Sequence, residues 1–144
     1  MSDKAKIAII GTGWWATQAH IPTLKDNPRA EIVLVDRNPA ALHKASTGYD
    51  ISHAYTSLAE ARDAHPDIRG AVVAVPHHAH YAVAREVLES GLQLLLEKPM
   101  TLYAWEAKEL VELAEQKGLE ILMGYTFPYV DPLLETRKRV DDGL

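Results

Sequence analysis

Cysteine is absent from the 144-residue sequence. Disulfide bonds, thiolate metal sites and cysteine nucleophiles are therefore excluded. The sequence also lacks any apolar run near the roughly 20 residues that a membrane-spanning helix needs. The first six residues, MSDKAK, are polar and do not resemble a signal peptide. We therefore expect a soluble, cytoplasmic protein with no membrane partner.

An excess of positive charge is lacking as well. Fifteen lysines and arginines stand against twenty acidic residues, which gives a formal net charge of −5. Proteins that bind nucleic acids through phosphates need clustered lysine and arginine. The one basic run, ETRKRV, is short and close to acidic residues, so we interpret it as a solvated helix face. We expect no nucleic-acid partner.

The chain is long enough for one domain, and 47% of its residues are hydrophobic. Short apolar runs alternate with helix-compatible stretches. The predicted strands are Lys6–Gly11, Glu31–Asp36, His53–Ser57, Gly70–Pro76, Leu92–Glu97 and Glu120–Tyr125. The predicted helices are Trp15–Lys25, Pro39–Ser46, Leu58–Ala64, Ala79–Ser90 and Leu102–Lys117. Most strands are continuously apolar, which is typical of strands covered on both faces. The pattern predicts an α/β fold, a doubly wound parallel sheet spanning residues 1–144.

Ligands of such sheets bind outside the carboxyl ends of the strands, so strand ends are where chemistry is expected. The first strand ends in GTGWWA, a G-x-G-x-x-G/A pattern that runs from Gly11 through Thr12 to Ala16. Gly11 permits the tight turn, Gly13 lets backbone approach a pyrophosphate, and Ala16 allows close packing of helix and strand. The helix that follows offers its free N–H groups to phosphates. These residues predict a nucleotide site, and a plain tight turn is the alternative.

Asp36 closes the second predicted strand, where an acidic residue would accept hydrogen bonds from an adenosine ribose. Arg37 follows it and could instead hold a 2′-phosphate. Asp36 would repel that phosphate, so we predict NAD as the cofactor, with NADP as the alternative. Glycine-rich turns followed by an acid also occur in S-adenosylmethionine-dependent methyltransferases, so these residues alone leave the cofactor class open.

Two tryptophans, Trp14 and Trp15, occupy the turn itself. We expect one of them to pack under the edge of the sheet and the other to lie over the nicotinamide or the substrate entrance.

The fourth predicted strand leads into AVPHHAHYA. Neither cysteine nor carboxylate lies among its histidines, so we predict no metal site. Val75 and Pro76 are placed to form a smooth wall against a flat cofactor ring. His77, His78 and His80 would line the crevice or cap the next helix, and for His80 a functional and a structural role are equally compatible with the spacing.

The fifth predicted strand ends in EKP, namely Glu97, Lys98 and Pro99. A lysine at the end of a core strand is either a solvated terminus or a cation at the mouth of a binding crevice. Spacing alone does not separate these two interpretations.

Four segments together resemble the N-terminal domain of the Gfo/Idh/MocA oxidoreductases, the family named for glucose-fructose oxidoreductase and inositol dehydrogenase. They are GTGWWA, LVD, AVPHHAHYAVAREVLESGLQLLLEKPM and MGYTFPY, and the resemblance runs from about Lys6 to the end of the sequence. Its most specific element is the Val75-Pro76-x-x-x-His80 segment paired with the downstream Glu97-Lys98-Pro99, one helix and one strand later.

The resemblance implies a nicotinamide-dependent dehydrogenase or reductase that acts on a sugar, a polyol or a related hydroxyl compound. It implies a catalytic role for Lys98, beside both nicotinamide and substrate, with Pro99 shaping the turn that aims it. A lysine there could hydrogen-bond the reacting hydroxyl, and desolvation would make it a better proton-transfer partner. Glu97 would orient Lys98 or contact the cofactor.

Members of this family continue into a second domain that supplies substrate contacts. That domain is absent from the 144 residues, so we expect a truncated two-domain oxidoreductase, inactive by itself and weakly self-associating. The segment GYTFPY also departs from the asparagine or arginine common in the family at that place. A non-catalytic nucleotide-sensing module and a methyltransferase remain as alternative functions.

Overall fold

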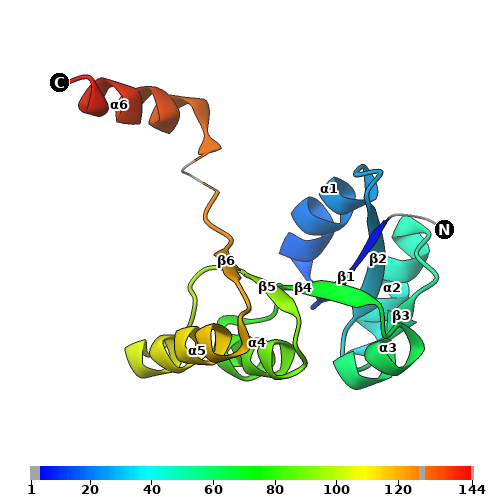
Figure 1. The fold of residues 1–144 in the computed structure, drawn as a ribbon. Coiled ribbons are helices and arrows are strands. Elements are labelled where there is room, and N and C mark those ends of the chain that lie inside the picture. The colour runs from blue at the N-terminus through cyan, green and yellow to red at the C-terminus, as the bar shows by residue number, and fades with distance from the viewer. Residues whose placement is uncertain (1–3, 127–128, 144) are drawn as a thin grey trace.

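The computed structural model describes residues 4–126 and 129–143. Six strands form one fully parallel sheet in the order β3-β2-β1-β4-β5-β6 (Figure 1). The strands are β1 Ala5–Ile10, β2 Ala30–Val35, β3 Ala54–Tyr55, β4 Ile68–Val73, β5 Gln93–Leu96 and β6 Ile121–Met123. The predicted doubly wound sheet is confirmed. The strand order reverses between β1 and β4, which places the switch point there.

Helices cover the two faces of the sheet unequally. One buried cluster packs β1, β2, β4 and β5 against α3 (Leu58–Ala64), α4 (His80–Glu89) and α5 (Ala104–Lys117). The other packs the opposite face against α1 (Ile21–Lys25), its preceding turn and α2 (Pro39–Tyr49). Strands buried on both faces read as continuous apolar runs, which is the pattern seen in the sequence.

Local sequence signals explain several helix ends. The Asn38 side chain caps α2 by accepting from the N–H groups of Ala40 and Ala41. Ser57 caps α3 in the same way through Glu60 N–H. Gly118 ends α5 in the left-handed conformation that glycine adopts without strain.

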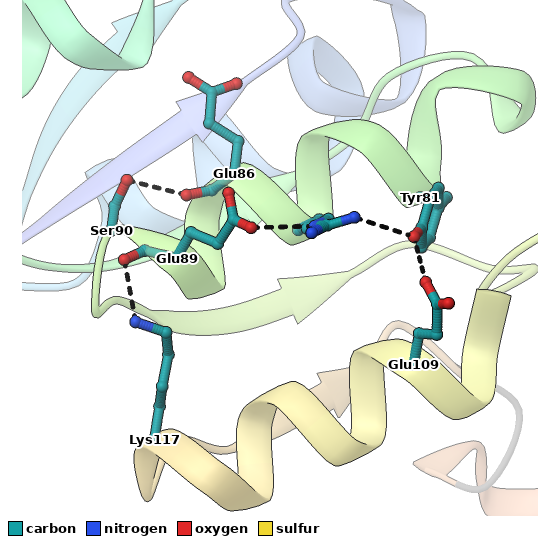
Figure 2. Close-up of polar contacts among 7 residues, drawn as sticks. Tyr81, Glu86, Glu89, Ser90, Glu109 and Lys117 are labelled. Carbon is teal, nitrogen blue, oxygen red and sulfur yellow. Dashed lines mark hydrogen bonds and ion pairs between the residues drawn. The ribbon is translucent and has the colours of Figure 1, made fainter.

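Side chains join α4 to α5 across the surface of the sheet (Figure 2). The Tyr81 hydroxyl donates to the Glu109 carboxylate, and this hydrogen bond raises the pKa of Tyr81. At the other end of the pair, Lys117 Nζ donates to the Glu89 carbonyl oxygen at 3.1 Å. The two helices that follow β4 and β5 therefore hold each other in register.

The helix expected over Trp15–Lys25 is present, but its middle is not α-helical. Trp14, Trp15 and Ile21–Lys25 are α-helical, and a π-helical turn, η1, covers Ala16–His20. Pro22 lies in the first turn of α1, directly after η1, and has no N–H to donate to the carbonyl groups of η1. π-Turns inside helices are frequent at functional sites, and this one lies beside the glycine-rich turn.

The remaining elements follow the prediction with small shifts. A 3₁₀ turn, η2 (His77–Ala79), precedes α4. The basic run ETRKRV lies in α6 (Asp131–Asp141), whose residues are all exposed, which confirms a solvated helix. Figure 1 shows α6 apart from the sheet and the other helices. No helix in the described part of the chain is long and apolar enough to cross a membrane.

Candidate cofactor and active site

The carboxyl ends of the strands carry two neighbouring pockets on the two sides of the switch point. The hydrogen bonding between neighbouring strands continues one residue past their ends. Gly11 N–H donates to the Val35 carbonyl oxygen at 2.8 Å, and Ala74 N–H donates to the Ile10 carbonyl oxygen at 2.9 Å. Both pockets are lined by Ala74 and Val75, which follow β4. A ligand that spans both would therefore cross the sheet where the strand order reverses.

The first pocket, of about 430 Å³, lies over β1 and β2 and is lined by Gly11, Gly13, Asp36 and Arg37 among others. Gly11 has φ +93°, and a Cβ added there would lie 2.6 Å from the Ala74 carbonyl oxygen. At Gly13, in contrast, a Cβ would meet nothing within 4 Å. The first glycine thus serves the turn, while the second leaves open space in front of the following helix, as the sequence predicts.

Asp36 is bound to the glycine-rich turn itself. Its Oδ2 accepts from the backbone N–H and the hydroxyl of Thr12, both at 2.7 Å, and its Oδ1 accepts from Asn38 N–H at 2.8 Å. The carboxylate thereby joins the ends of β1 and β2. An ionised carboxylate has about four acceptor positions, so capacity for further donors remains in the pocket. The next residue, Arg37, is exposed.

The second pocket, of about 650 Å³, lies on the β5 and β6 side of the switch point. Its lining combines Trp14 and Trp15 with Val75, His77, Lys98 and Tyr125. Trp14 is 73% exposed and Tyr125 is 54% exposed. Neither tryptophan is buried under the edge of the sheet, so the expectation that one of them packs there is wrong.

His80 is fully buried at the start of α4, although it borders the second pocket. Its Nδ1 lies 2.6 Å from the Pro99 carbonyl oxygen, and its Nε2 lies 3.0 Å from the Val75 carbonyl oxygen. Both ring nitrogens thus face backbone carbonyl oxygens, to which a ring N–H can donate, and this favours a structural role. His80 ties the Val75-Pro76 segment to the EKP turn, and this explains why the two motifs are spaced by one helix and one strand.

The other two histidines of that segment differ from each other. His77 borders the second pocket, whereas His78 is exposed and lines neither pocket. Among the described residues, no group of three or more histidine and carboxylate side chains is arranged to hold a metal ion.

Glu97 and Lys98, adjacent in sequence, have opposite surroundings. Glu97 is 7% exposed, and its Oε1 accepts from Trp15 Nε1 at 2.7 Å and from His20 Nε2 at 2.8 Å. Lys98 is exposed, precedes Pro99 across a cis peptide bond and lines the second pocket. Within residues 4–126 and 129–143, no ion pair or hydrogen bond engages the Lys98 amine. The amine is therefore the group of the EKP motif available to a ligand.

The sequence profile of one family, described as the GFO_IDH_MocA oxidoreductase family with an NAD-binding Rossmann fold, matches residues 5–125. The chain belongs to this family. An uncharacterised oxidoreductase of Synechocystis sp. is 32% identical over 130 residues, which are 90% of this chain and 34% of that protein. A candidate UDP-kanosamine synthase oxidoreductase subunit of Amycolatopsis mediterranei is 33% identical over 126 residues, 86% of this chain and 34% of that protein.

Solved structures show the same fold. GenD2 from gentamicin A biosynthesis, crystallised in complex with NAD, superposes with a TM-score of 0.88 at 27% identity, over 97% of this chain and 40% of GenD2. The predicted family, Rossmann fold and NAD cofactor are confirmed. The chain spans about a third of the length of the curated relatives described above.

Residue roles within this GFO_IDH_MocA domain remain predictions, but the structure brings most of the predicted residues together. Gly11, Gly13, Asp36, Arg37 and Pro76 line the first pocket, whereas Trp14, Trp15, His80, Glu97 and Lys98 line the second. Val75 lines both pockets. Thr12 and Pro99 line neither pocket, but Thr12 is hydrogen-bonded to Asp36 and the Pro99 carbonyl oxygen contacts His80. Phe127 and Pro128 of the MGYTFPY motif lie outside the described residues.

Two residues at the Glu97 carboxylate were missed from the sequence. His20 follows the glycine-rich motif by one helical turn, and nothing in its spacing links it to a residue 77 positions later. Gly124 follows β6, and a Cβ there would come within 2.8 Å of Glu97 Oε1. Its place at a strand end was the one available signal.

Proposed function

We propose that the chain is the cofactor domain of a nicotinamide-dependent dehydrogenase or reductase that acts on a sugar, a polyol or a related hydroxyl compound. The observation that carries the proposal is the pair of pockets sharing Ala74 and Val75, with Asp36 in one and Lys98 in the other. A dinucleotide laid across Val75 would have its adenosine ribose near Asp36 and its nicotinamide near Lys98.

The residues present fit such a cofactor. The space in front of Gly13 and the free N–H groups at the start of the helix suit a pyrophosphate. The Asp36 carboxylate suits unmodified ribose hydroxyls and disfavours a 2′-phosphate, which supports NAD over NADP. A bound nicotinamide supplies hydride acceptance or donation.

Lys98 is proposed to exchange the proton of the reacting oxygen. In oxidation of an alcohol, a bound nicotinamide would accept the hydride from the carbinol carbon, and the Lys98 amine would accept the hydroxyl proton. In the reverse direction the ammonium returns that proton to the carbonyl oxygen. The exposed amine has no competing partner among the described residues, which suits this role.

The name of the Amycolatopsis mediterranei relative refers to UDP-kanosamine, which supports a sugar compound as the substrate class. A non-catalytic nucleotide-sensing module would share the first pocket but would have no use for the free Lys98 amine. The family assignment argues against a methyltransferase.

Calorimetric titration of the 144-residue chain with NAD⁺, NADH, NADP⁺ and NADPH tests the proposal. We expect binding of the NAD pair and weaker binding of the NADP pair. Asp36→Ala should reduce or invert this preference, and Glu112→Ala, which removes an exposed carboxylate on α5, is the control for loss of charge. Absence of binding by any of the four to a folded sample would overturn the proposal. We also propose that the chain alone has negligible dehydrogenase activity, and robust NAD⁺ reduction with polyols or sugars would contradict that.

A further inference from the structure

The Glu97 carboxylate is the most enclosed acidic group at the pocket edge of the sheet, and the proposed reaction assigns it no step. It follows β5, is 7% exposed and lies directly against Gly124. A Cβ on Gly124 would be 2.8 Å from Oε1 and 3.0 Å from Oε2, so backbone closes one side of the carboxylate. Burying a carboxylate without compensating hydrogen bonds is costly, so donors around Glu97 are expected.

The donors come from the glycine-rich turn and the helix after it. Trp15 Nε1 donates to Oε1 at 2.7 Å, and His20 Nε2 lies 2.8 Å from the same oxygen. Because an ionised carboxylate can only accept, the His20 ring donates through Nε2. The second oxygen, Oε2, accepts from the backbone N–H of Lys98 at 3.3 Å. One side chain thus contacts the pocket wall and the backbone of the proposed proton-transfer residue.

The π-helical turn η1 explains how both donors reach the same oxygen. Trp15 and His20 are five residues apart and lie at the two ends of η1. In an α-helix, residues five apart do not share a face, because only positions three or four apart are neighbours. The wider π-turn changes this spacing, and both rings point to Glu97. The π-turn is therefore the backbone form that this three-residue cluster requires.

Trp15 separates two hollows. It lines the 650 Å³ pocket with Lys98, and it also lines a hollow of about 390 Å³ on the α1 side of the sheet, together with His20, Leu24, Leu95 and Leu122. Trp15 is 37% exposed, so packing covers only part of it. The hydrogen bond from its indole N–H to Glu97 adds a directional contact that orients the ring in the wall of the pocket.

We propose that Glu97 and His20 are positioning residues: they hold the Trp15 indole and the Lys98 backbone in one arrangement, and Glu97 does not bind the cofactor directly. This inference rests on the proposed function for its consequence in binding. The cluster itself exists without a ligand, so it can be tested separately.

The first test is a two-dimensional ¹H–¹⁵N spectrum of the 144-residue chain without cofactor. The chain has three tryptophans, so the indole N–H signals can be assigned with Trp→Phe variants. We expect the Trp15 signal downfield of those of Trp14 and Trp105, because its N–H donates to a carboxylate. Glu97→Gln should move the Trp15 signal upfield and leave the Trp105 signal unchanged. An unshifted Trp15 signal in a folded Glu97→Gln sample would overturn the inference, whatever the chain binds.

The second test is a double-mutant cycle in NADH affinity. Trp15→Phe keeps an aromatic ring in the wall but removes the N–H donor together with part of the indole volume, and Glu97→Gln removes the carboxylate. We expect each to weaken binding by roughly tenfold, and the double variant also by roughly tenfold, because both remove one interaction. If Glu97 instead contacted the cofactor, the losses would multiply to roughly a hundredfold, and the inference would be wrong.

His20 completes the test. His20→Gln retains a donor at a position near Nε2 and should preserve the Trp15 signal and most of the affinity, whereas His20→Leu should lose both. Equal behaviour of these two variants would contradict a hydrogen-bonding role. Glu112→Gln, which removes an exposed carboxylate on α5, is the control for loss of charge. If NADH fails to bind the unmodified chain, the proposed function is wrong. The spectrum would still show whether the Trp15 indole N–H donates to Glu97.

Discussion

The two ends of the parallel sheet both collect histidines and charged side chains, yet only one of them resembles a ligand site. At the amino end, Lys6 Nζ lies 3.0 Å from an Asp67 carboxylate oxygen and 3.9 Å from a Glu31 oxygen. His53 Nε2 lies 3.4 Å from Glu31, and the Tyr55 hydroxyl lies 3.0 Å from His65 Nε2. Every one of these groups is partnered by another side chain.

At the carboxyl end, the two carboxylates instead accept hydrogen bonds from the protein's own turn and helix, and the Lys98 ammonium is left without a side-chain partner among the described residues. Asp36 and Glu97 accept from the glycine-rich turn and its helix, while the Lys98 amine meets no partner in the part of the chain that the structure describes. Backbone N–H groups and open space are also found here. The comparison shows that a similar set of residue types becomes a closed cluster at one end of the strands and a site at the other.

Substitution of the glycines in the glycine-rich turn is expected to have the largest effect on the carboxyl end of the sheet. Gly11→Ala would force a side chain into φ +93° and place its Cβ 2.6 Å from the Ala74 carbonyl oxygen. We expect a loss of unfolding free energy on the order of 2–4 kcal/mol and loss of NADH binding. Gly13→Ala is the matched variant, because its Cβ meets open space, and it should keep the stability and lose affinity. Urea unfolding and calorimetry measure both, and equal stability of the two variants would contradict the prediction.

Removing the free cation tests the same end without disturbing the fold. In an active oxidoreductase that contains this domain, Lys98→Met should retain NADH binding and lower kcat by about 10²-fold or more, because a positioned proton-transfer group is lost. Steady-state kinetics with a cofactor titration measure the two effects separately. Lys108→Met, on the exposed surface of α5, is the control. Unchanged turnover would remove Lys98 from the mechanism.

At the amino end, His65 should make stability depend on pH. Burial lowers the pKa of His65 below its ordinary value of 6.5, and the neighbouring His53 and Lys6 lower it further, against the opposing pull of Asp67 and Glu31. Below about pH 6.5 the unfolded chain therefore binds more protons than the folded chain, so the unfolding free energy should fall as pH falls through this value.

The His65→Gln variant isolates this dependence from that of the other titrating groups. The difference in unfolding free energy between the two proteins should narrow as pH is lowered from about 7.5 to about 5. Chemical denaturation at a series of pH values gives the comparison. A difference that stays constant over this range would show that His65 titrates alike in both states.

The smallest effect is expected from the exposed ion pair. The hydrogen bond that Lys6 Nζ donates to the Asp67 carboxylate lowers the pKa of Asp67 and raises the pKa of Lys6, but both groups are accessible to solvent that screens them. Lys6→Met should change the melting temperature little and leave NADH affinity unaltered. A marked loss of affinity would mean that the two ends of the sheet are coupled, and the comparison would then fail.

The sequence predicted the fold and most of the site because both follow from strand ends. Apolar runs located five strands to within a few residues, and the residues that follow them, Asp36, Val75 and Lys98, lie at the pockets as expected. The predicted strand His53–Ser57 is shorter in the structure, Ala54–Tyr55, since the edge position leaves one side unpaired. Family resemblance supplied the functional meaning of the EKP motif.

Contacts made by side chains from distant segments could not be predicted in this way. A buried hydrogen bond between His20 and Glu97 depends on where η1 meets β5, which is a property of tertiary packing rather than of either motif. For the same reason the sequence left open whether Glu97 orients Lys98 or contacts the cofactor. In the structure Glu97 is buried and Lys98 is exposed.

Both lateral edges of the sheet are formed by very short strands, since β3 has two residues and β6 has three. An edge strand is a template on which another chain can add a strand, and short edges offer little to extend. Association of this chain through its exposed aromatic side chains should therefore remain reversible on dilution and should not seed fibrils. The short edge strands β3 and β6 thereby limit aggregation of the chain by strand addition.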